Sequence, residues 1–262
     1  PDGSRNPLHD KTTQYHGFGY LEDILDEHSS VTMVLGTSHD QFQIPDNPGQ
    51  APSFVVNGQS NFDSSKLNEN QREITHYGLL ALQKKLDGVD VQISGFTRYS
   101  SAYFTPDPLG DLLFDGIAQT AYRRSIATGS QGDGSYRIAA DHTLRAGYFI
   151  QGERSTSATN SLVVALDPDG SQVSDSPVSI LDSGGKTGWL YGVYLQDEWK
   201  ILPWVTVNYG ARFDIVDEYA HDHMLSPRVN IVWEPTETTT IKAGYSRYLV
   251  PPPFALIGAT DV

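Results

Sequence analysis

The chain has 262 residues and a formal net charge of -14, from 18 basic against 32 acidic side chains. This excess of carboxylates argues against a polyanion such as nucleic acid as a partner. The absence of cysteine excludes disulfides, thiolate chemistry and cysteine-ligated zinc. No run of 18 apolar residues occurs, so no membrane-spanning helix is expected, although membrane-spanning strands would escape this criterion.

Strands and turns dominate the predicted secondary structure. Few segments hold a helical apolar period, whereas 24 Gly and 15 Pro punctuate stretches rich in Tyr, Thr and Val. We predict ten antiparallel strands in five hairpins: 13–25 with 31–44, 73–86 with 89–104, 122–139 with 143–155, 187–200 with 205–216, and 226–234 with 239–248. The pair Asp87-Gly88 is a strong signal for a tight hairpin turn. An all-β fold with negligible helix is therefore expected.

The connections between the predicted strands alternate between short and long. Turns inside each hairpin take a few residues, whereas segments 45–71, 105–121 and 156–186 between hairpins are long and rich in Pro, Gly, Ser, Asp and Asn. Short turns at one end and long loops at the other are typical of an outer-membrane barrel, with periplasmic turns and extracellular loops. A soluble sandwich usually mixes turn lengths at both ends.

Apolar and polar side chains alternate along most of the predicted strands, which are longer than strands of soluble proteins usually are. In a membrane barrel the apolar parity would face lipid and the polar parity a wet or plugged lumen. The predicted lipid-facing residues are Trp189, Tyr191, Val193, Leu195, Val205, Val207, Tyr209, Ala211, Phe213, Val229, Ile231 and Trp233. The predicted lumen-facing residues are Gln196, Glu198, Asn208, Arg212, Asp214, Arg228 and Asn230. Asp197 lies on the apolar parity, which requires a position near the membrane interface, and segment 77–82 has no cleanly apolar parity.

Four segments together resemble the barrel of TonB-dependent outer-membrane receptors. They are "YHGFGYLEDILDEHSSVTMVLGTSHDQFQIP" at 15–45, "YLQDEWK" at 194–200, "VNYGARFD" at 207–214, and "LSPRVNIVWEPTETTTIKAGYSRYLVPPP" at 225–253. The resemblance covers nearly the whole chain and implies one partial barrel domain over residues 1–262. It also implies a place in the bacterial outer membrane, surrounded by lipid, and an extracellular small ligand such as a ferric siderophore or another nutrient.

The chain departs from such receptors in what it lacks. Whole receptors have about 22 strands, a Gly-rich plug domain and an energy-coupling box, and contact with the TonB complex runs through the plug. This sequence shows no plug, no box and about ten strands, and it starts at Pro1 without a signal peptide. We therefore expect a middle part of a barrel, with two free sheet edges near Thr13 and Tyr248.

The segment "SGGKTG" at 183–188 is a weak match to a phosphate-binding loop. The required glycine five residues before the Gly of the Gly-Lys pair is replaced by Ile180, and no helical pattern follows. A mobile loop entering a strand is the preferred interpretation.

The segment "HDH" at 221–223 places His221 and His223 on one side of an extended chain, where two imidazoles could hold a divalent metal. No third ligand is identifiable, and a solvated extracellular loop is the preferred interpretation.

The segment "DPDGSQVSD" at 167–175 resembles a calcium loop only in part. Gly170 comes at position 4, where the EF-hand spacing needs it at position 6, so an ordinary turn is preferred. The lumen-parity residues Glu198 and Asp214 could form an acid–base pair, but inward charges are usual in barrels.

The leading hypothesis is a transport receptor that binds a scarce nutrient without covalent chemistry, hence no enzyme and no cofactor. The first alternative is a soluble all-β carbohydrate-binding or adhesin module that uses the same loops. The second alternative is an all-β hydrolase with paired carboxylates. Dependence on detergent would separate the first hypothesis from the other two.

Overall fold

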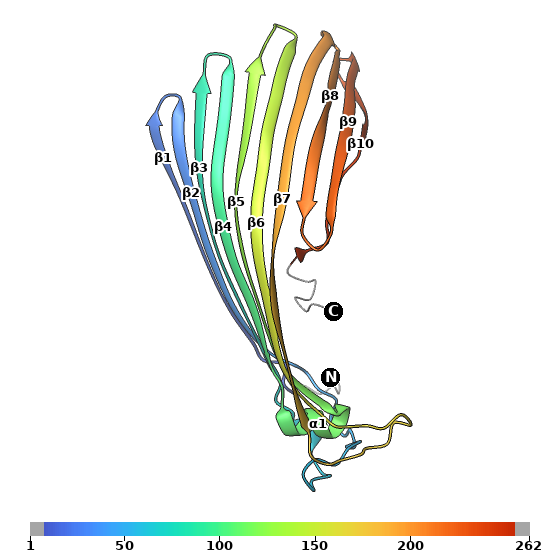
Figure 1. The fold of residues 1–262 in the computed structure, drawn as a ribbon. Coiled ribbons are helices and arrows are strands. Elements are labelled where there is room, and N and C mark those ends of the chain that lie inside the picture. Colours follow the sequence, from blue (N-terminus) through green and yellow to red (C-terminus); the bar gives the residue numbers. More distant parts are fainter. Residues whose placement is uncertain (1–7, 255–262) are drawn as a thin grey trace.

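The computed structural model describes residues 8–254, which form a single antiparallel sheet of ten strands in sequential order (Figure 1). The strands are β1 (Thr12–Asp26), β2 (Ser29–Gln43), β3 (Asn70–Leu86), β4 (Val89–Thr105), β5 (Ile117–Arg137), β6 (His142–Val163), β7 (Val178–Leu202), β8 (Val205–Asp217), β9 (His221–Thr236) and β10 (Thr239–Ser246). The predicted all-β fold with five hairpins is confirmed.

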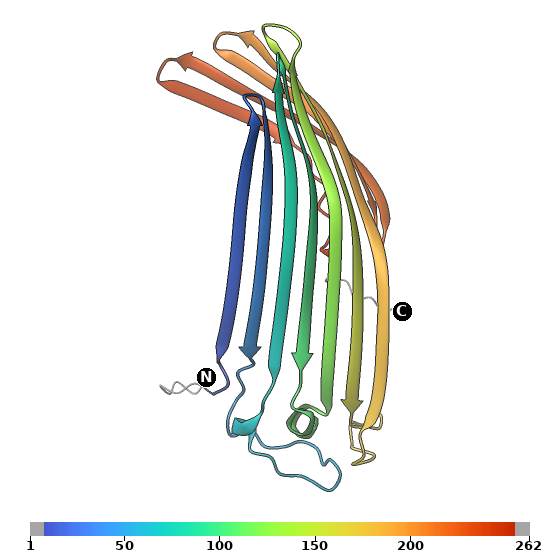
Figure 2. The same cartoon turned by 90° about the vertical axis from the view of Figure 1, so that its left-hand side faces the viewer.

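All five hairpin turns lie at one end of the sheet, which we name the turn end, and the long connections lie at the other, the loop end (Figures 1 and 2). The long connections are 44–69, 106–116 and 164–177. A fourth connection at the loop end, 218–220, is short. The three long connections expected between hairpins are therefore all present at the loop end.

Several strands extend beyond their predicted ends. β6 continues to Val163 and β7 starts at Val178, so the predicted loop 156–186 shrinks and "SGGKTG" lies inside β7 instead of a mobile loop. β9 starts at His221, so "HDH" is part of a strand and not of a loop. The Ser- and Gly-rich composition suggested loops, yet Ser155 pairs with Lys186 and Ser157 with Gly184. Pairing between strands satisfies the backbone N–H and C=O groups whatever the side chains are. Whether a Ser- or Gly-rich segment becomes a strand therefore depends on whether a neighbouring strand is present to pair with it.

The described residues contain little helix, as expected, and their one α-helix, α1 (Pro108–Asp115), lies within the predicted loop 105–121. The side chain of Asp107 accepts a hydrogen bond from the Gly110 backbone N–H at 3.0 Å, and Pro108 starts the first turn. Gly116 ends the helix with a φ of 74°, which glycine adopts without strain. These capping signals are local and could have been found in the sequence. A 3-10 turn, η1 (Ser64–Lys66), precedes β3.

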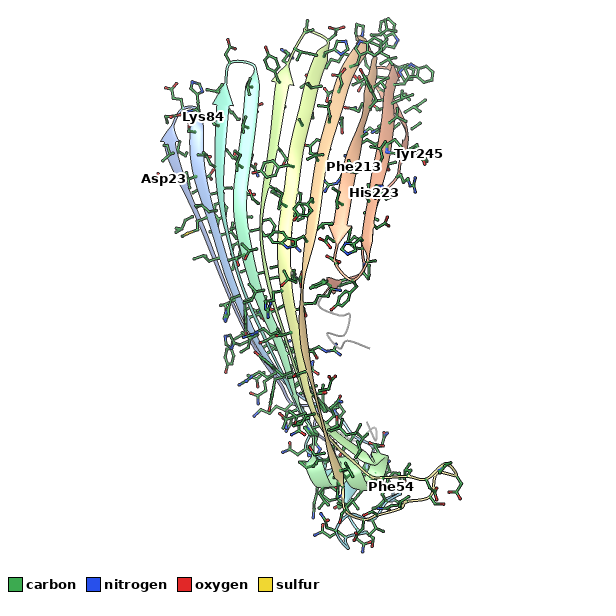
Figure 3. All side chains as sticks on the ribbon, viewed as in Figure 1. Asp23, Phe54, Lys84, Phe213, His223 and Tyr245 are labelled. Carbon is green, nitrogen blue, oxygen red and sulfur yellow. The ribbon has the colours of Figure 1, made fainter. Side chains whose placement is uncertain are left out.

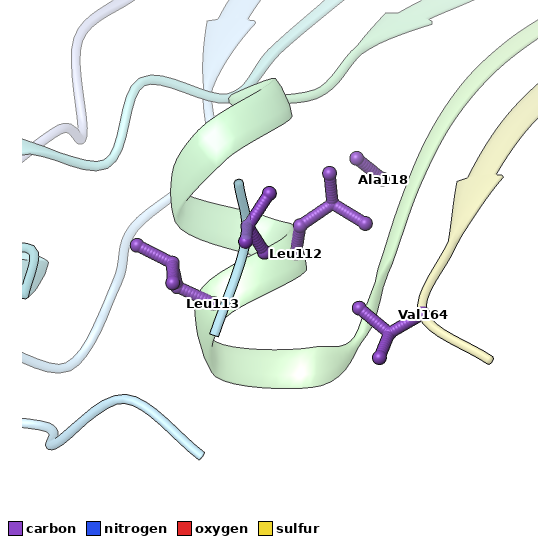
Figure 4. Close-up of a cluster of buried hydrophobic side chains, with 5 residues drawn as sticks. Leu112, Leu113, Ala118 and Val164 are labelled. Atoms are coloured by element: carbon purple, nitrogen blue, oxygen red, sulfur yellow. The ribbon is translucent and has the colours of Figure 1, made fainter. Parts of the chain in front are cut away.

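The helix and two long connections, 44–69 and 164–177, pack into one body at the loop end, which we name the loop cap. Its core consists of Val56, Leu112, Leu113, Ala118 and Val164 (Figure 4). Phe54, Phe62, Leu109 and Leu162 pack around this core. Backbone N–H groups of Ser53 and Phe54 both donate to the Leu113 carbonyl, at 2.8 and 3.0 Å. Val55 N–H donates to the Gln172 side chain at 2.9 Å, which joins the two connections. The loop cap is thus held by a hydrophobic core and by backbone hydrogen bonds.

The register of the sheet places the two predicted parities on opposite faces. Tyr191 pairs with Ile150 on one side and Ile215 on the other, so all three side chains share a face that we name the apolar face. Gly192, Tyr194 and Gln196 lie on the opposite, polar face. Buried side chains of the strands gather mostly on the polar face, for example those of Glu153, Ser155 and Asp214. Side chains are more crowded on the inner side of a curved sheet, so the polar face is the concave one. Figure 3 shows side chains projecting from both faces.

The sheet does not close on itself, because β1 and β10 have one strand neighbour each. Side chains of both parities are open to solvent on β1: Phe18 is 69% and Leu21 63% exposed. The two expected edges are therefore present, at the strands that begin near Thr13 and end near Tyr248.

We predict that Leu113→Ala loosens the loop cap and leaves the strands in place. Leu113 is completely buried, so removing its side chain costs about 2–5 kcal/mol of local stability. Hydrogen exchange should become faster at the amides of Ser53 and Phe54 and stay slow within β4 and β5. Leu166→Ala is the matched control, because Leu166 is 49% exposed in the same body. Equal exchange in both variants would contradict the assignment of this core.

Candidate functional site

The polar face of β5 to β9 carries a connected group of charged and hydrogen-bonding side chains. Tyr194 donates its hydroxyl to Asp133 at 2.6 Å, and the guanidinium of Arg228 lies 5.6 Å from the centre of the Tyr194 ring. Arg145 donates to Glu198 at 3.4 Å. The ring of Tyr194 lies over its register partner Gly147, where a Cβ would come within 2.5 Å of the ring. The glycine thus makes room for the aromatic side chain.

All seven predicted lumen-facing residues lie on this polar face. Gln196 shares one register row with Arg228, and Glu198 shares the next with Asn208 and Asn230. Arg212 and Asp214 follow on β8, where the Arg212 Nε donates to Asp214 at 2.6 Å. That this face borders a lumen stays a prediction.

A polar hollow of about 500 Å³ opens on the same face between β7 and β10. Its lining includes Gln196, Asn208, Arg228, Asn230, Lys242 and Tyr248. Two cations and three amides give this hollow donors for anionic or carbonyl oxygens of a ligand. The sequence analysis missed Lys242. Gly244 pairs with Asn230, and Lys242 lies two residues from Gly244 on the same strand, so strand alternation places Lys242 on the same face as Asn230.

The predicted lipid-facing residues share the apolar face across β7, β8 and β9. Leu195 pairs with Ala211, Val193 with Phe213, and Val207 with Ile231. The register extends this face to β10, where Ala243 pairs with Ile231. That the face contacts lipid stays a prediction.

Asp197, the misfit on the apolar parity, is only 8% exposed and has two hydrogen-bond partners. His142 Nδ1 lies 2.6 Å from its Oδ2, and the hydroxyl of Tyr209 donates to the same oxygen at 3.0 Å. The His142 ring stacks on Trp199 with 5.4 Å between centroids. These neighbours shield the carboxylate, and the partner His142 comes from a strand far away in sequence.

The carboxylates suggested as an acid–base pair do not meet. Glu198 pairs in register with Asn208, whereas Asp214 pairs with Gly192, six positions away along β7. At about 3.3 Å per residue, the two positions are about 20 Å apart. Glycoside hydrolases need about 5–10 Å between their carboxyl groups. Each carboxylate instead pairs with an arginine, Arg145 or Arg212.

The two candidate metal ligands lie at the loop end of β9. His221 Nδ1 is 2.7 Å from Asp217 Oδ1, and the His223 ring lies 6.0 Å from the Phe213 ring. Within residues 8–254, no group of three or more His, Cys, Asp or Glu side chains is arranged to hold a metal ion. The calcium-loop candidate forms a turn, in which Gly170 N–H donates to the Asp167 carbonyl at 3.0 Å.

An acidic cluster in the loop cap has no counterpart in the sequence predictions. Burial, then the neighbouring Glu69 carboxylate, raise the pKa of Asp111 to about 7, and Asp107 and Asp115 act in the same direction. Burial and the nearby Asp115 also raise the pKa of Glu69. Asp111 is 6% exposed on the inner side of α1. The cluster brings together the end of the connection 44–69 and the helix α1, so only the folded chain reveals it.

Comparison with known proteins gives a family and a set of similar folds. The family described as "TonB dependent receptor-like, beta-barrel" matches residues 3–261. The siderophore receptor PiuA from Acinetobacter baumannii aligns with a TM-score of 0.56 and 16% identity, over 93% of this chain and 43% of that chain. The ferric citrate transporter FecA aligns with a TM-score of 0.60 and 13% identity, over 91% and 36%.

The RagAB peptide transporter aligns with a TM-score of 0.60 and 9% identity, over 90% of this chain and 32% of that chain. The chain therefore spans about one third to two fifths of the length of these structures. No curated protein matches the sequence. In the described part of the chain, no helix is long and apolar enough to cross a membrane.

We predict that the loop cap loses stability as the pH rises from about 4 to 7. The folded state holds a proton on Asp111 up to about pH 7, whereas the unfolded chain releases it near the ordinary value of 3.8. The stabilisation is therefore complete below pH 3.8 and lost as pH passes through 7. Asp111→Asn keeps this side chain neutral and should remove most of the pH dependence.

Hydrogen exchange at the Phe54 amide, which is bonded to Leu113, measures this effect at each pH. Asp169→Asn is the control, because a hydrogen bond shared with the Asp167 side chain and hydrogen bonds donated by Ser171 lower the pKa of Asp169 to about 2. Asp169 is ionised throughout the range, so this variant should keep the wild-type profile. An unchanged profile in Asp111→Asn would overturn the role of Asp111.

Proposed function

Because the chain belongs to the TonB-dependent receptor-like β-barrel family, we propose that it forms part of the wall of an outer-membrane transport receptor. The apolar face contacts lipid, and the polar face lines the path of an extracellular nutrient. The turn end is periplasmic and the loop end, with the loop cap, is extracellular. No covalent step is involved.

One observation carries this proposal: the distance between the two tryptophans that bound the apolar part of β7 matches the thickness of the apolar band of outer-membrane barrels. Trp199 and Trp189 lie ten residues apart on β7 and on the apolar face, with Leu195, Val193 and Tyr191 between them. Ten residues span about 33 Å along a strand, and a tilt of 35–45° reduces this to about 25 Å across the membrane. Outer-membrane barrels have an apolar band of about this height between two aromatic girdles.

The architecture also disfavours the soluble alternatives. A lectin-like sandwich covers its apolar face with a second sheet, whereas the described strands form one layer. Val193 and Leu195 are each 55% exposed and have no protein layer over them. Lipid supplies the missing cover in the proposed arrangement. The separation of Glu198 and Asp214 likewise disfavours the hydrolase.

The ligand is proposed as a ferric siderophore or another scarce nutrient of similar polarity. The structures of similar fold include a siderophore receptor, a ferric citrate transporter and a peptide transporter, so the fold alone does not select the ligand. The donors around the polar hollow, Arg228 and Lys242, suit an anionic ligand. Coupling to the TonB complex would pass through a plug domain, which residues 8–254 do not form.

Uptake in whole cells tests the proposed function. Cells with and without the gene are supplied with a panel of iron-55 siderophores, ferric citrate and labelled peptides, with and without a protonophore. We expect the gene to confer protonophore-sensitive uptake of at least one anionic compound. Recovery of the protein from the aqueous fraction without detergent would overturn the proposal.

The assignment of faces predicts opposite tolerance at two adjacent residues of β8. Val207→Arg places a charge on the lipid-facing side and should lower the free energy of unfolding by about 2–4 kcal/mol if the site lies near the midplane, and less near the interface. Asn208→Arg places the same charge on the polar face and should cost far less. Unfolding of both variants by guanidinium in phosphatidylcholine vesicles measures the difference. Equal costs would refute the assigned parity.

A further inference from the structure

The distribution of charge on the apolar face is one-sided over four strands. In a chain with 32 acidic residues, the apolar face of the described strands β3, β4, β5 and β6 carries no carboxylate. Its charged side chains are Lys84 near the turn end and Arg72, Arg124 and Arg154 toward the loop end. The carboxylates of the same strands, such as Glu73, Asp133 and Glu153, lie on the polar face. On these four strands, all carboxylates therefore lie on the polar face.

The three arginines lie at one depth. Arg72 is 14 residues from Leu86 at the turn end of β3, Arg124 is 13 from Arg137 on β5, and Arg154 is 12 from His142 on β6. Thirteen residues correspond to about 43 Å along a strand, or about 33 Å across the membrane at a tilt near 40°. Trp189 is 13 residues from Leu202 on β7 and lies at the same depth. The arginines thus follow the loop-end border of the apolar band.

Two tyrosine rings extend from Arg72 across the apolar face toward β5. The Arg72 guanidinium lies 5.8 Å from the centre of the Tyr103 ring, and the Tyr103 and Tyr122 rings meet at 6.1 Å. Both tyrosines are on the apolar face, because Tyr103 pairs with Arg72 and with Tyr122. We name Arg72, Arg124, Arg154, Tyr103 and Tyr122 the arginine–tyrosine patch.

The arginines of the patch are exposed and have no carboxylate partner within residues 8–254. Elsewhere in the sheet, Arg145 and Arg212 are paired with Glu198 and Asp214. Guanidinium groups bind phosphate through two parallel hydrogen bonds, and tyrosine hydroxyls at a membrane interface add donors. A row of unpaired cations at the lipid surface therefore complements a row of phosphates.

We propose that the arginine–tyrosine patch binds the phosphate groups of lipids in the leaflet at the loop end. The inference rests on the proposed membrane function, because it needs the apolar face to contact lipid. The occupant is a lipid with a phosphate-bearing anionic headgroup, whose acyl chains lie along the apolar band of β3 to β6.

Native mass spectrometry of the whole receptor in a neutral detergent tests this site. The probes are dioleoyl phosphatidic acid and dioleoyl phosphatidylcholine, which have the same acyl chains and differ in headgroup charge. We expect wild type to retain phosphatidic acid preferentially. The variant R72A/R124A/R154A should bind it at least about tenfold more weakly, because charge-assisted hydrogen bonds to the phosphate are lost.

The matched control is R98A/R123A/R145A, which removes the same charge from the polar face of β4, β5 and β6. It should keep the preference for phosphatidic acid. If the triple variant fails to fold, single variants at two adjacent residues of β5 repeat the comparison. Arg124→Gln is the test on the apolar face, and Arg123→Gln is the control on the polar face. Equal retention of the two lipids by wild type, or equal losses in test and control variants, would overturn the site.

Flotation with phosphatidylcholine vesicles separates this failure from failure of the proposed function. A receptor that floats with these vesicles but shows no preference for phosphatidic acid contacts lipid without the phosphate site. A receptor that stays in the aqueous fraction without detergent contradicts both.

Discussion

Uninterrupted backbone pairing across ten strands is the constraint on which the rest of this structure depends. The register runs from β1 to β10 with shifts only at Ile24/Asp26, Lys200/Leu202 and Thr239/Ile241, each next to a hairpin turn. A one-residue slip would move every side chain of a strand to the other face. Because the shifts are confined to the turns, each position in the strands keeps a fixed face and a fixed distance from the turn end.

The fixed faces explain how one layer of strands can serve two environments. The polar face holds arginine–carboxylate pairs that neutralise each other, such as Arg212 with Asp214. On β7 the apolar face between Trp199 and Trp189 carries one charged residue, Asp197, which is hydrogen-bonded to His142 and Tyr209. A carboxylate in an apolar environment carries a desolvation cost that hydrogen bonds reduce. Both hydrogen bonds of Asp197 go to its Oδ2, whereas the buried Oδ1 has no hydrogen-bond partner within residues 8–254. The desolvation cost of this carboxylate is therefore only partly offset.

Period-two patterning was enough to predict the strands with strongly alternating side chains, such as β7 from Trp189 to Trp199 and all of β8. It failed where the pattern is weak. The second half of β6 contains Ser, Thr and Asn, which alone favour a loop, yet each pairs with β7. The core of the loop cap joins Val56 to Val164, more than one hundred residues apart, and the acidic neighbours of Asp111 include Glu69 on another segment. Contacts between distant segments leave no periodic signal, whereas the caps of α1 at Asp107 and Gly116 are local and were readable.

The two parts of the molecule are stabilised by different surroundings. The loop cap has its own buried core around Leu113, so its exterior can be exposed to water. Its stability depends on the packing of this core and on the protonation of Asp111. The wall of strands has no core of this kind, because Tyr191, Val193 and Leu195 are exposed on one face and polar groups occupy the other. Its apolar face is stable only where a nonpolar medium covers it. Trp189 and the arginines at its depth mark the border between these two regimes, since an indole ring or a guanidinium on a long stem can satisfy both at once. The same strands continue past this border toward α1, so in the proposed arrangement their length sets how far the loop cap stands from the membrane surface.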